Sequence, residues 1–134
     1  MPSFDYKEQE SGIFGKVLRP LIDFEAYSVV RNKWMIVENV LADTGADVSI
    51  LPKDLGEALV GDLTKGELTE IKGIVPYAKL IVYIHNLKFK INSTEFELPV
   101  AIADSNDLPP ILGRVKGLDL FDANFEKGKM INLK

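Results

Sequence analysis

Cysteine is absent from this chain of 134 residues, and histidine occurs only once. Without cysteine there is neither a disulfide nor a thiolate ligand, and one histidine cannot supply a zinc site built from several histidines. We therefore expect no metal site and predict no cofactor. Because disulfides are typical of oxidising compartments, their absence also favours a cytoplasmic location.

Long apolar runs and a surplus of basic charge are missing as well. No apolar run approaches the roughly 20 residues that span a bilayer, and residues 1–10 lack the basic start and apolar core of a secretion signal. The formal net charge is -4 at pH 7, so a phosphate backbone would gain little by binding this chain. We expect neither a membrane nor a nucleic-acid partner.

The composition is that of an ordinary folded domain. Hydrophobic residues make up 46% of the chain and charged residues 27%, and the length suits one hydrophobic core. Residues 1–12 have little apolar periodicity and predict an N-terminal arm, whose ordering would need a partner surface. Residues 13–134 predict a single domain.

Most of this domain reads as β-strands separated by turns. Runs rich in β-branched and aromatic residues alternate with turn formers, which predicts a mainly β fold of antiparallel hairpins. The expected strands cover residues 13–18, 20–30, 34–41, 67–72, 77–91 and 96–103, and two short strands around Lys127-Gly128 are expected within residues 124–133. Residues 53–63 fit either a short helix or a turn-rich connection, because two glycines weaken the helical pattern. Residues 115–123 are the other candidate for a short helix.

A polar bend interrupts two apolar strands in the segment V-L-A-D-T-G-A-D-V-S-I-L-P, residues 40–52. Asp43 follows three apolar residues, and a carboxylate in apolar surroundings needs hydrogen-bonding partners because its desolvation costs several kcal/mol. Gly45 allows close approach of the backbone, and the Thr44 hydroxyl can both donate and accept a hydrogen bond. This pattern makes Asp43 a candidate catalytic carboxylate. The plain alternative is a strand-ending turn capped by aspartate.

The bend resembles the signature of the retropepsin-like aspartic proteases. Residues 41–46 read L-A-D-T-G-A, and the match continues through Asp47, Ser49, Ile50 and Leu51. A second family element, an apolar pair followed by Gly-Arg, is present as I-L-G-R at residues 111–114. The resemblance covers roughly residues 18–125. It implies a closed, antiparallel acid-protease half-barrel with one short C-terminal helix, which works as a homodimer.

The resemblance also implies a mechanism that needs two chains. Only Asp43 lies in a D-T-G motif, so a two-fold axis would bring one Asp43 from each subunit together, and the pair would share one proton. The ionised member would activate a water as general base, and the protonated member would hydrogen-bond the carbonyl of a peptide or unfolded protein. The Thr44 hydroxyls would lock the two loops together, and Gly45 would present its backbone to the substrate.

Further roles follow from the same resemblance. Arg114, after Gly113, would support the site through a bidentate contact with Asp47; two unrelated surface charges are the alternative reading. The flap tip, residues 72–77, reads K-G-I-V-P-Y, with one glycine where viral members have several, so a stiffer or differently shaped lid is expected. The residues expected to contact substrate are Ala46, Asp47, Gly73, Ile74, Val75 and Tyr77.

Two other functions remain open from the sequence. The first is a catalytically silent dimer of the same fold that binds peptides or organises an assembly. The second is an unrelated β-barrel interaction domain with a chance D-T-G. His85 and Trp34, each the only residue of its type, are interpreted as structural residues of strands.

Overall fold

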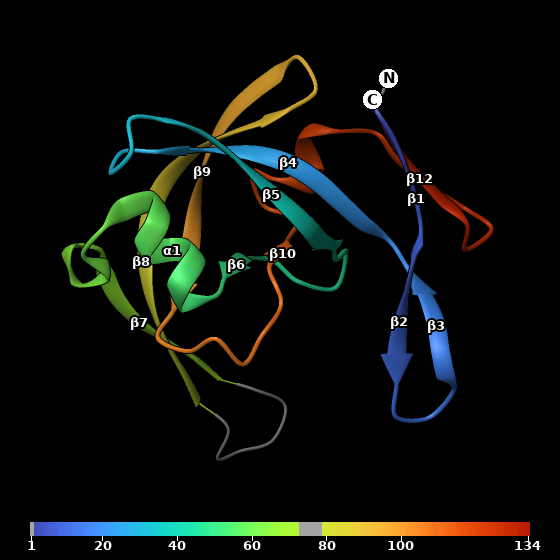
Figure 1. The fold of residues 1–134 in the computed structure, drawn as a ribbon, viewed down its shortest axis with the longest axis horizontal. Helices are drawn as coiled ribbons and strands as arrows, with labels where there is room; N and C mark the ends of the chain where they lie inside the picture. Colours follow the sequence, from blue (N-terminus) through green and yellow to red (C-terminus); the bar gives the residue numbers. More distant parts are fainter. Residues whose placement is uncertain (1, 73–78) are drawn as a thin grey trace.

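A computed structural model describes residues 2–72 and 79–134 (Figure 1). Its largest sheet has the strand order β4-β5-β10-β6-β9-β8-β7, and an additional pairing of β4 with β8 closes a barrel of six strands. The prediction of a mainly β, closed barrel is therefore confirmed. The strands of this sheet are β4 (Leu21–Ser28), β5 (Lys33–Ala42), β6 (Ser49–Leu51), β7 (Glu67–Lys72), β8 (Lys79–Ile91), β9 (Thr94–Ala103) and β10 (Ile111–Leu112).

The barrel is filled by the apolar residues that the strand pattern places on its inner face. In β4 the side chains of Ile22, Phe24 and Ala26 alternate with more exposed ones, as expected for a half-buried strand. Phe24 packs against Phe89 of β8, with ring centroids 4.9 Å apart. Trp34 lies in β5, 5.4 Å from the ring of Tyr27 in β4, which agrees with its predicted role in strand packing.

The first α-helix, α1 (Lys53–Val60), occupies the segment that the sequence left open between helix and turn. Gly56 is buried on its inner face, and a Cβ at this position would lie 2.1 Å from Cγ2 of Ile102. The glycine that weakens the helix in isolation thus permits the helix to pack closely on β9. His85 lies nearby in β8, where its Nε2 is 2.9 Å from the carbonyl oxygen of Leu63 in the 3-10 helix η1 (Leu63–Lys65).

The expected C-terminal helix over residues 115–123 is shorter than predicted. Only Leu118–Leu120 is helical, as the 3-10 helix η2. Lys116 has a φ of 58°, which is incompatible with a right-handed helix, and the amides of Leu118 and Asp119 bond back to Gly113 and Arg114 instead. None of the helices in the described part of the chain is long and apolar enough to cross a membrane.

The N-terminal residues form strands as well. β1 (Ser3–Asp5) pairs with β12 (Met130–Leu133), which also pairs with β11 (Ala123–Glu126), so that both termini lie at one corner of the molecule (Figure 1). β2 (Lys7–Ser11) and β3 (Gly15–Arg19) form a separate hairpin. The division into an arm and a domain stays a prediction, but β1 finds its partner strand within the same chain.

Candidate active site

Asp43 lies in the loop that leaves the end of β5 and leads into β6. β10, which comes some 70 residues later in the sequence, is inserted between these two strands: it pairs in parallel with β5, where Ile111 lies opposite Leu41, and antiparallel with β6. The amide of Asp43 donates to the carbonyl oxygen of Leu112 at 3.0 Å. The structure therefore brings the D-T-G and I-L-G-R segments into direct contact.

The loop itself holds the carboxylate of Asp43. Oδ1 accepts a hydrogen bond from the amide of Gly45 at 2.9 Å, and the carbonyl oxygen of Asp43 lies 3.3 Å from the amide of Ala46. The Asp43 side chain is half-buried, whereas Thr44 and Gly45 are exposed. One carboxylate oxygen thus has the hydrogen-bonding partner that the sequence requires, and the tip of the loop faces outward.

Gly113 is the point of closest approach between the two segments. Its amide donates to the buried hydroxyl of Ser49 at 2.9 Å, and the next amide, that of Arg114, donates to the carbonyl oxygen of Ala46, also at 2.9 Å. A Cβ on Gly113 would lie 2.5 Å from the carbonyl oxygen of Val48, so only glycine fits. Sequence reasoning gave Ser49 no role, although a small polar residue between apolar neighbours was the available signal.

The ion pair between Arg114 and Asp47 is present, but it is not bidentate. Nη1 of Arg114 lies 3.4 Å from Oδ1 of Asp47, whose side chain is 85% exposed. The two-point contact is made with Asp119 of η2, through Nε at 3.4 Å and Nη2 at 3.3 Å. The expected geometry is therefore wrong: the turn at Lys116 brings Asp119 back to Arg114 and leaves most of the Asp47 carboxylate free.

We expect Arg114→Ala to lower the free energy of unfolding of a single chain by less than about 1 kcal/mol, because an exposed ion pair contributes little in water. The backbone bonds from Arg114 to Ala46 and from Val115 to Asp47 remain in this variant. Thermal melts at low protein concentration test the expectation. A loss of more than about 10 °C would mean that the guanidinium supports the fold far more than its exposure indicates.

A second apolar cluster adjoins the Asp43 loop. Val48 and Ile50, which follow the D-T-G segment, are partly buried against Val82 of β8 and Ala101 and Ala103 of β9. The remaining members are Ile71, Leu80, Ile84 and Leu108. Val48 and Ile50 thus leave part of their apolar surface exposed directly after the Asp43 loop. The expected substrate contacts at Gly73, Ile74, Val75 and Tyr77 lie outside the described residues.

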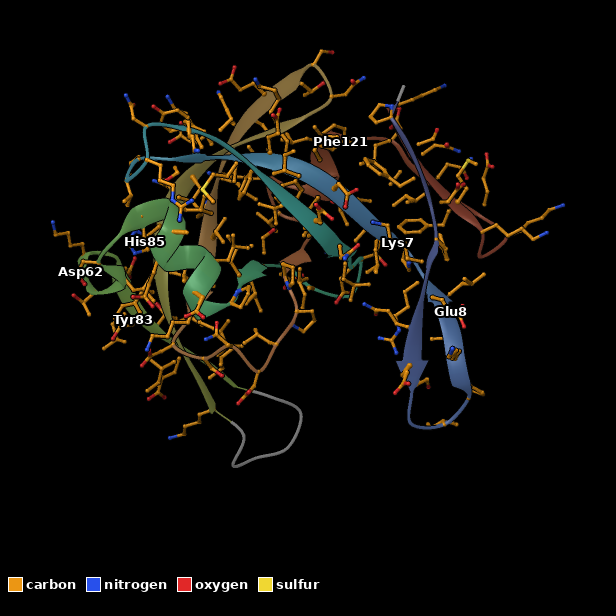
Figure 2. The ribbon with its side chains drawn as sticks, viewed as in Figure 1. Lys7, Glu8, Asp62, Tyr83, His85 and Phe121 are labelled. Atoms are coloured by element: carbon orange, nitrogen blue, oxygen red, sulfur yellow. The ribbon has the colours of Figure 1, made fainter. Side chains whose placement is uncertain are left out.

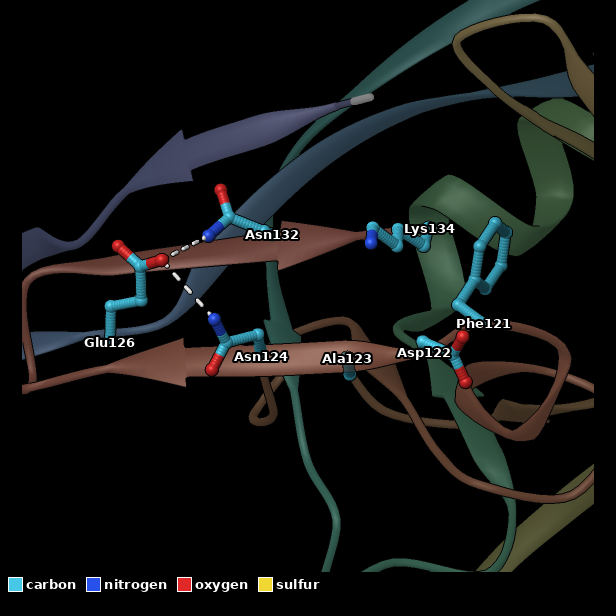
Figure 3. Close-up of a pocket in the computed structure, with 7 residues that line it drawn as sticks. All are labelled: Phe121, Asp122, Ala123, Asn124, Glu126, Asn132 and Lys134. Carbon is cyan, nitrogen blue, oxygen red and sulfur yellow. Dashed lines mark hydrogen bonds between the residues drawn. The ribbon is translucent and has the colours of Figure 1, made fainter.

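A depression in the surface of a single chain lies elsewhere. A cavity of about 550 Å³ opens over β11 and β12 (Figure 3). Nδ2 of Asn124 and Nδ2 of Asn132 both donate to Oε1 of Glu126, at 3.1 and 2.9 Å, so these polar groups already bond to one another. None of the predicted site residues lines this cavity. The Asp43 loop therefore remains the candidate site, because it holds the half-buried carboxylate that the sequence singles out.

Comparison with known proteins is consistent with this arrangement at the level of the fold. No protein-family model and no curated protein matches the sequence. A retropepsin-like aspartic protease from Rickettsia conorii is similar in structure, with a TM-score of 0.61 and 18% identity over 98% of this chain and 90% of that one. EIAV protease, in a complex with the inhibitor HBY-793, has a TM-score of 0.51 and 21% identity over 78% of this chain and 86% of its own. The chain therefore has the fold of the retropepsin-like aspartic proteases.

Proposed function

We propose that this chain is one subunit of a homodimeric aspartic endopeptidase in which Asp43 is the catalytic residue. The observation that carries the proposal is the Asp43 loop: a half-buried carboxylate, held through one oxygen by the amide of Gly45, at the outward end of a strand. The retropepsin-like fold supports it, because the two structures compared above are described as proteases.

One chain supplies half of the required groups. Hydrolysis of a peptide bond by carboxylates alone needs a general base for the water and an acid for the carbonyl oxygen. Two Asp43 side chains across a two-fold axis supply both, because close like charges share one proton. The exposure of Thr44 and Gly45 supports this arrangement, since it leaves the tip of the loop open to a second copy.

The substrate class follows from the surroundings of the loop. Val48 and Ile50 offer an apolar surface next to Asp43, which favours bulky apolar side chains beside the bond that is cleaved. The free part of the Asp47 carboxylate can accept hydrogen bonds from the backbone amides of an extended peptide. We therefore propose extended segments of peptides or unfolded proteins as substrates.

A catalytically silent dimer is the second candidate, favoured by the single-point contact between Arg114 and Asp47, which leaves the loop less tightly braced than expected. The two candidates share their fold and their assembly and differ in turnover. Incubation of the protein with a denatured protein at mildly acidic pH, read by mass spectrometry of the products, separates them. Peptides that appear only with the intact Asp43 support the endopeptidase.

The proposed mechanism predicts that activity rises more steeply than linearly with protein concentration. Each active site requires two chains, so its abundance follows the monomer–dimer equilibrium until the dimer is saturated. Initial rates over a dilution series, compared with sedimentation velocity, test this expectation. Constant specific activity at concentrations where only monomer sediments would exclude a two-chain site.

A further inference from the structure

The β2–β3 hairpin stands apart from the barrel. Its five pairs of residues, from Lys7 opposite Arg19 to Ser11 opposite Gly15, form a separate two-stranded sheet, and no other strand in residues 2–72 and 79–134 pairs with either edge. Figure 1 shows the hairpin projecting from the body of the molecule. An isolated two-stranded hairpin is only marginally stable in water, so we expect this hairpin to pack against a further surface.

The tip of this hairpin presents two apolar side chains in a fixed conformation. Ile13 and Phe14 are 85% and 76% exposed. The hydroxyl of Ser11 accepts hydrogen bonds from both of their amides, each at 3.3 Å, and Gly15 closes the turn with a φ of 72°. We call Ile13 and Phe14 the apolar tip. Its backbone is held in place while its side chains are left without cover, as expected for a docking element.

The base of the hairpin is fastened to the strands that deliver Asp43. Nζ of Lys7 contacts Oδ1 of Asp23 in β4 at 3.3 Å and Oδ1 of Asn39 in β5 at 2.6 Å. Just beyond the hairpin, the carbonyl oxygen of Pro20 accepts a hydrogen bond from Ala42, the residue before Asp43. Figure 2 places Lys7 where the hairpin leaves the barrel. The direction of the hairpin is therefore fixed relative to the active-site loop.

The geometry points to a second copy of this chain as the partner that the tip contacts, an inference that rests on the proposed two-chain mechanism. That mechanism places the second copy against the Asp43 loop, next to the base of the hairpin. Strands of this length reach about 17 Å, and the radius of gyration of a domain of this size is about 14 Å. A hairpin that starts beside the loop is thus long enough to extend over the neighbouring subunit.

The chain also offers exposed apolar side chains that can receive the tip. Val115 and Leu120 are 48% and 52% exposed, and the amide of Val115 donates to the carbonyl oxygen of Asp47, so Val115 borders the same loop. We propose that the β2–β3 hairpin is a dimerisation arm whose apolar tip packs on Val115 and Leu120 of the second copy. In a two-fold dimer each chain gives one arm and receives one.

Removal of the apolar tip tests this assignment. Ile13→Ser with Phe14→Ser should raise the dissociation constant of the dimer at least about tenfold, because it removes two apolar side chains that would be buried between the subunits. The matched control is Val29→Ser with Val30→Ser, an exposed apolar pair in the turn after β4, which should leave the dissociation constant unchanged. Sedimentation velocity over a dilution series measures both variants in the Asp43→Asn background, which prevents self-digestion. Equal dissociation constants for all three proteins would overturn the arm.

A cross-link places the contact directly, because the chain contains no cysteine of its own. Phe14→Cys protein mixed with Leu120→Cys protein under mild oxidation should give a covalent heterodimer. Phe14→Cys mixed with Val29→Cys is the control and should give far less. Equal yields in the two mixtures would contradict the assigned contact, even if the tip variants weaken the dimer.

The outcomes separate this inference from the proposed function. A wild-type dimer that cleaves protein and is insensitive to loss of the tip overturns the arm and leaves the function standing. A dimer that depends on the tip but does not cleave protein supports the dimerisation arm and contradicts the proposed endopeptidase activity. Vesicles of phosphatidylcholine and phosphatidylserine test lipid as the occupant: tip-dependent binding to them, with an unchanged dimer dissociation constant, would also overturn the arm.

Discussion

Replacement of Asp43 by asparagine should reduce cleavage of a denatured protein by at least about 1,000-fold, because an amide cannot take up the proton of the attacking water. The loop should survive the change. Asparagine keeps an oxygen in the place of Oδ1, which accepts the hydrogen bond from Gly45, and it places no charge at the dimer axis. We therefore expect a folded dimer without activity, measured by digestion and by sedimentation of the same sample.

Asp54→Asn is the matched control for this variant. It makes the same chemical change at an exposed position in the first turn of α1, and it should leave cleavage within twofold of the wild-type rate. If Asp43→Asn protein cleaves as fast as this control, Asp43 is not the catalytic residue and the proposed function is wrong. If both variants unfold, the comparison moves to Asp43→Glu, which keeps the charge and displaces it.

The largest loss of stability is expected for Gly113→Ala. The added Cβ would lie 2.5 Å and 2.7 Å from the carbonyl oxygen and carbon of Val48, and 2.9 Å from the carbonyl oxygen of Ala46. All three are backbone atoms, so no side-chain rotation relieves the overlap, and β10 must move away from the active-site loop. Such overpacking costs about 3 kcal/mol, or roughly 10 °C in melting temperature for a domain of this size.

Gly12→Ala serves as the control for Gly113→Ala. A Cβ at Gly12 would meet nothing within 4 Å, so the same addition of one methyl group should change the melting temperature by no more than a few degrees. Differential scanning calorimetry of both variants gives the comparison. A Gly113→Ala protein that melts with the wild type would show that the contact between the two segments is looser than the distances indicate.

The sequence predicted the centre of this molecule better than its periphery. Most of the apolar strands were predicted, because buried strands carry a strong periodic signal. The expected contact of Arg114 with Asp47 also linked the I-L-G-R and D-T-G segments, although the strand β10 was not predicted. The helix at Lys53–Val60 was left open, since the reason for Gly56 is a contact with Ile102, far away in the sequence. No local pattern records such a contact.

The β2–β3 hairpin and the contact of Arg114 with Asp119 could not be predicted from the sequence, for related reasons. The strand K-E-Q-E-S at Lys7–Ser11 has no apolar alternation, and it forms because β3 supplies its hydrogen bonds. Arg114 takes Asp119 rather than Asp47 as its two-point partner, because Lys116 adopts a left-handed conformation that reverses the chain. Both features depend on backbone geometry, which residue types alone do not specify.

The insertion of β10 between β5 and β6 has a consequence for how the protein folds. The active-site loop receives its closing hydrogen bonds from Leu112 to Val115, so a chain that has emerged from the ribosome only as far as β9 lacks the strand that supports Asp43. Contacts over such long separations form slowly, because the intervening segment must first be ordered. Under the proposed function, the nascent chain has no organised proteolytic site until almost all of the domain has been made.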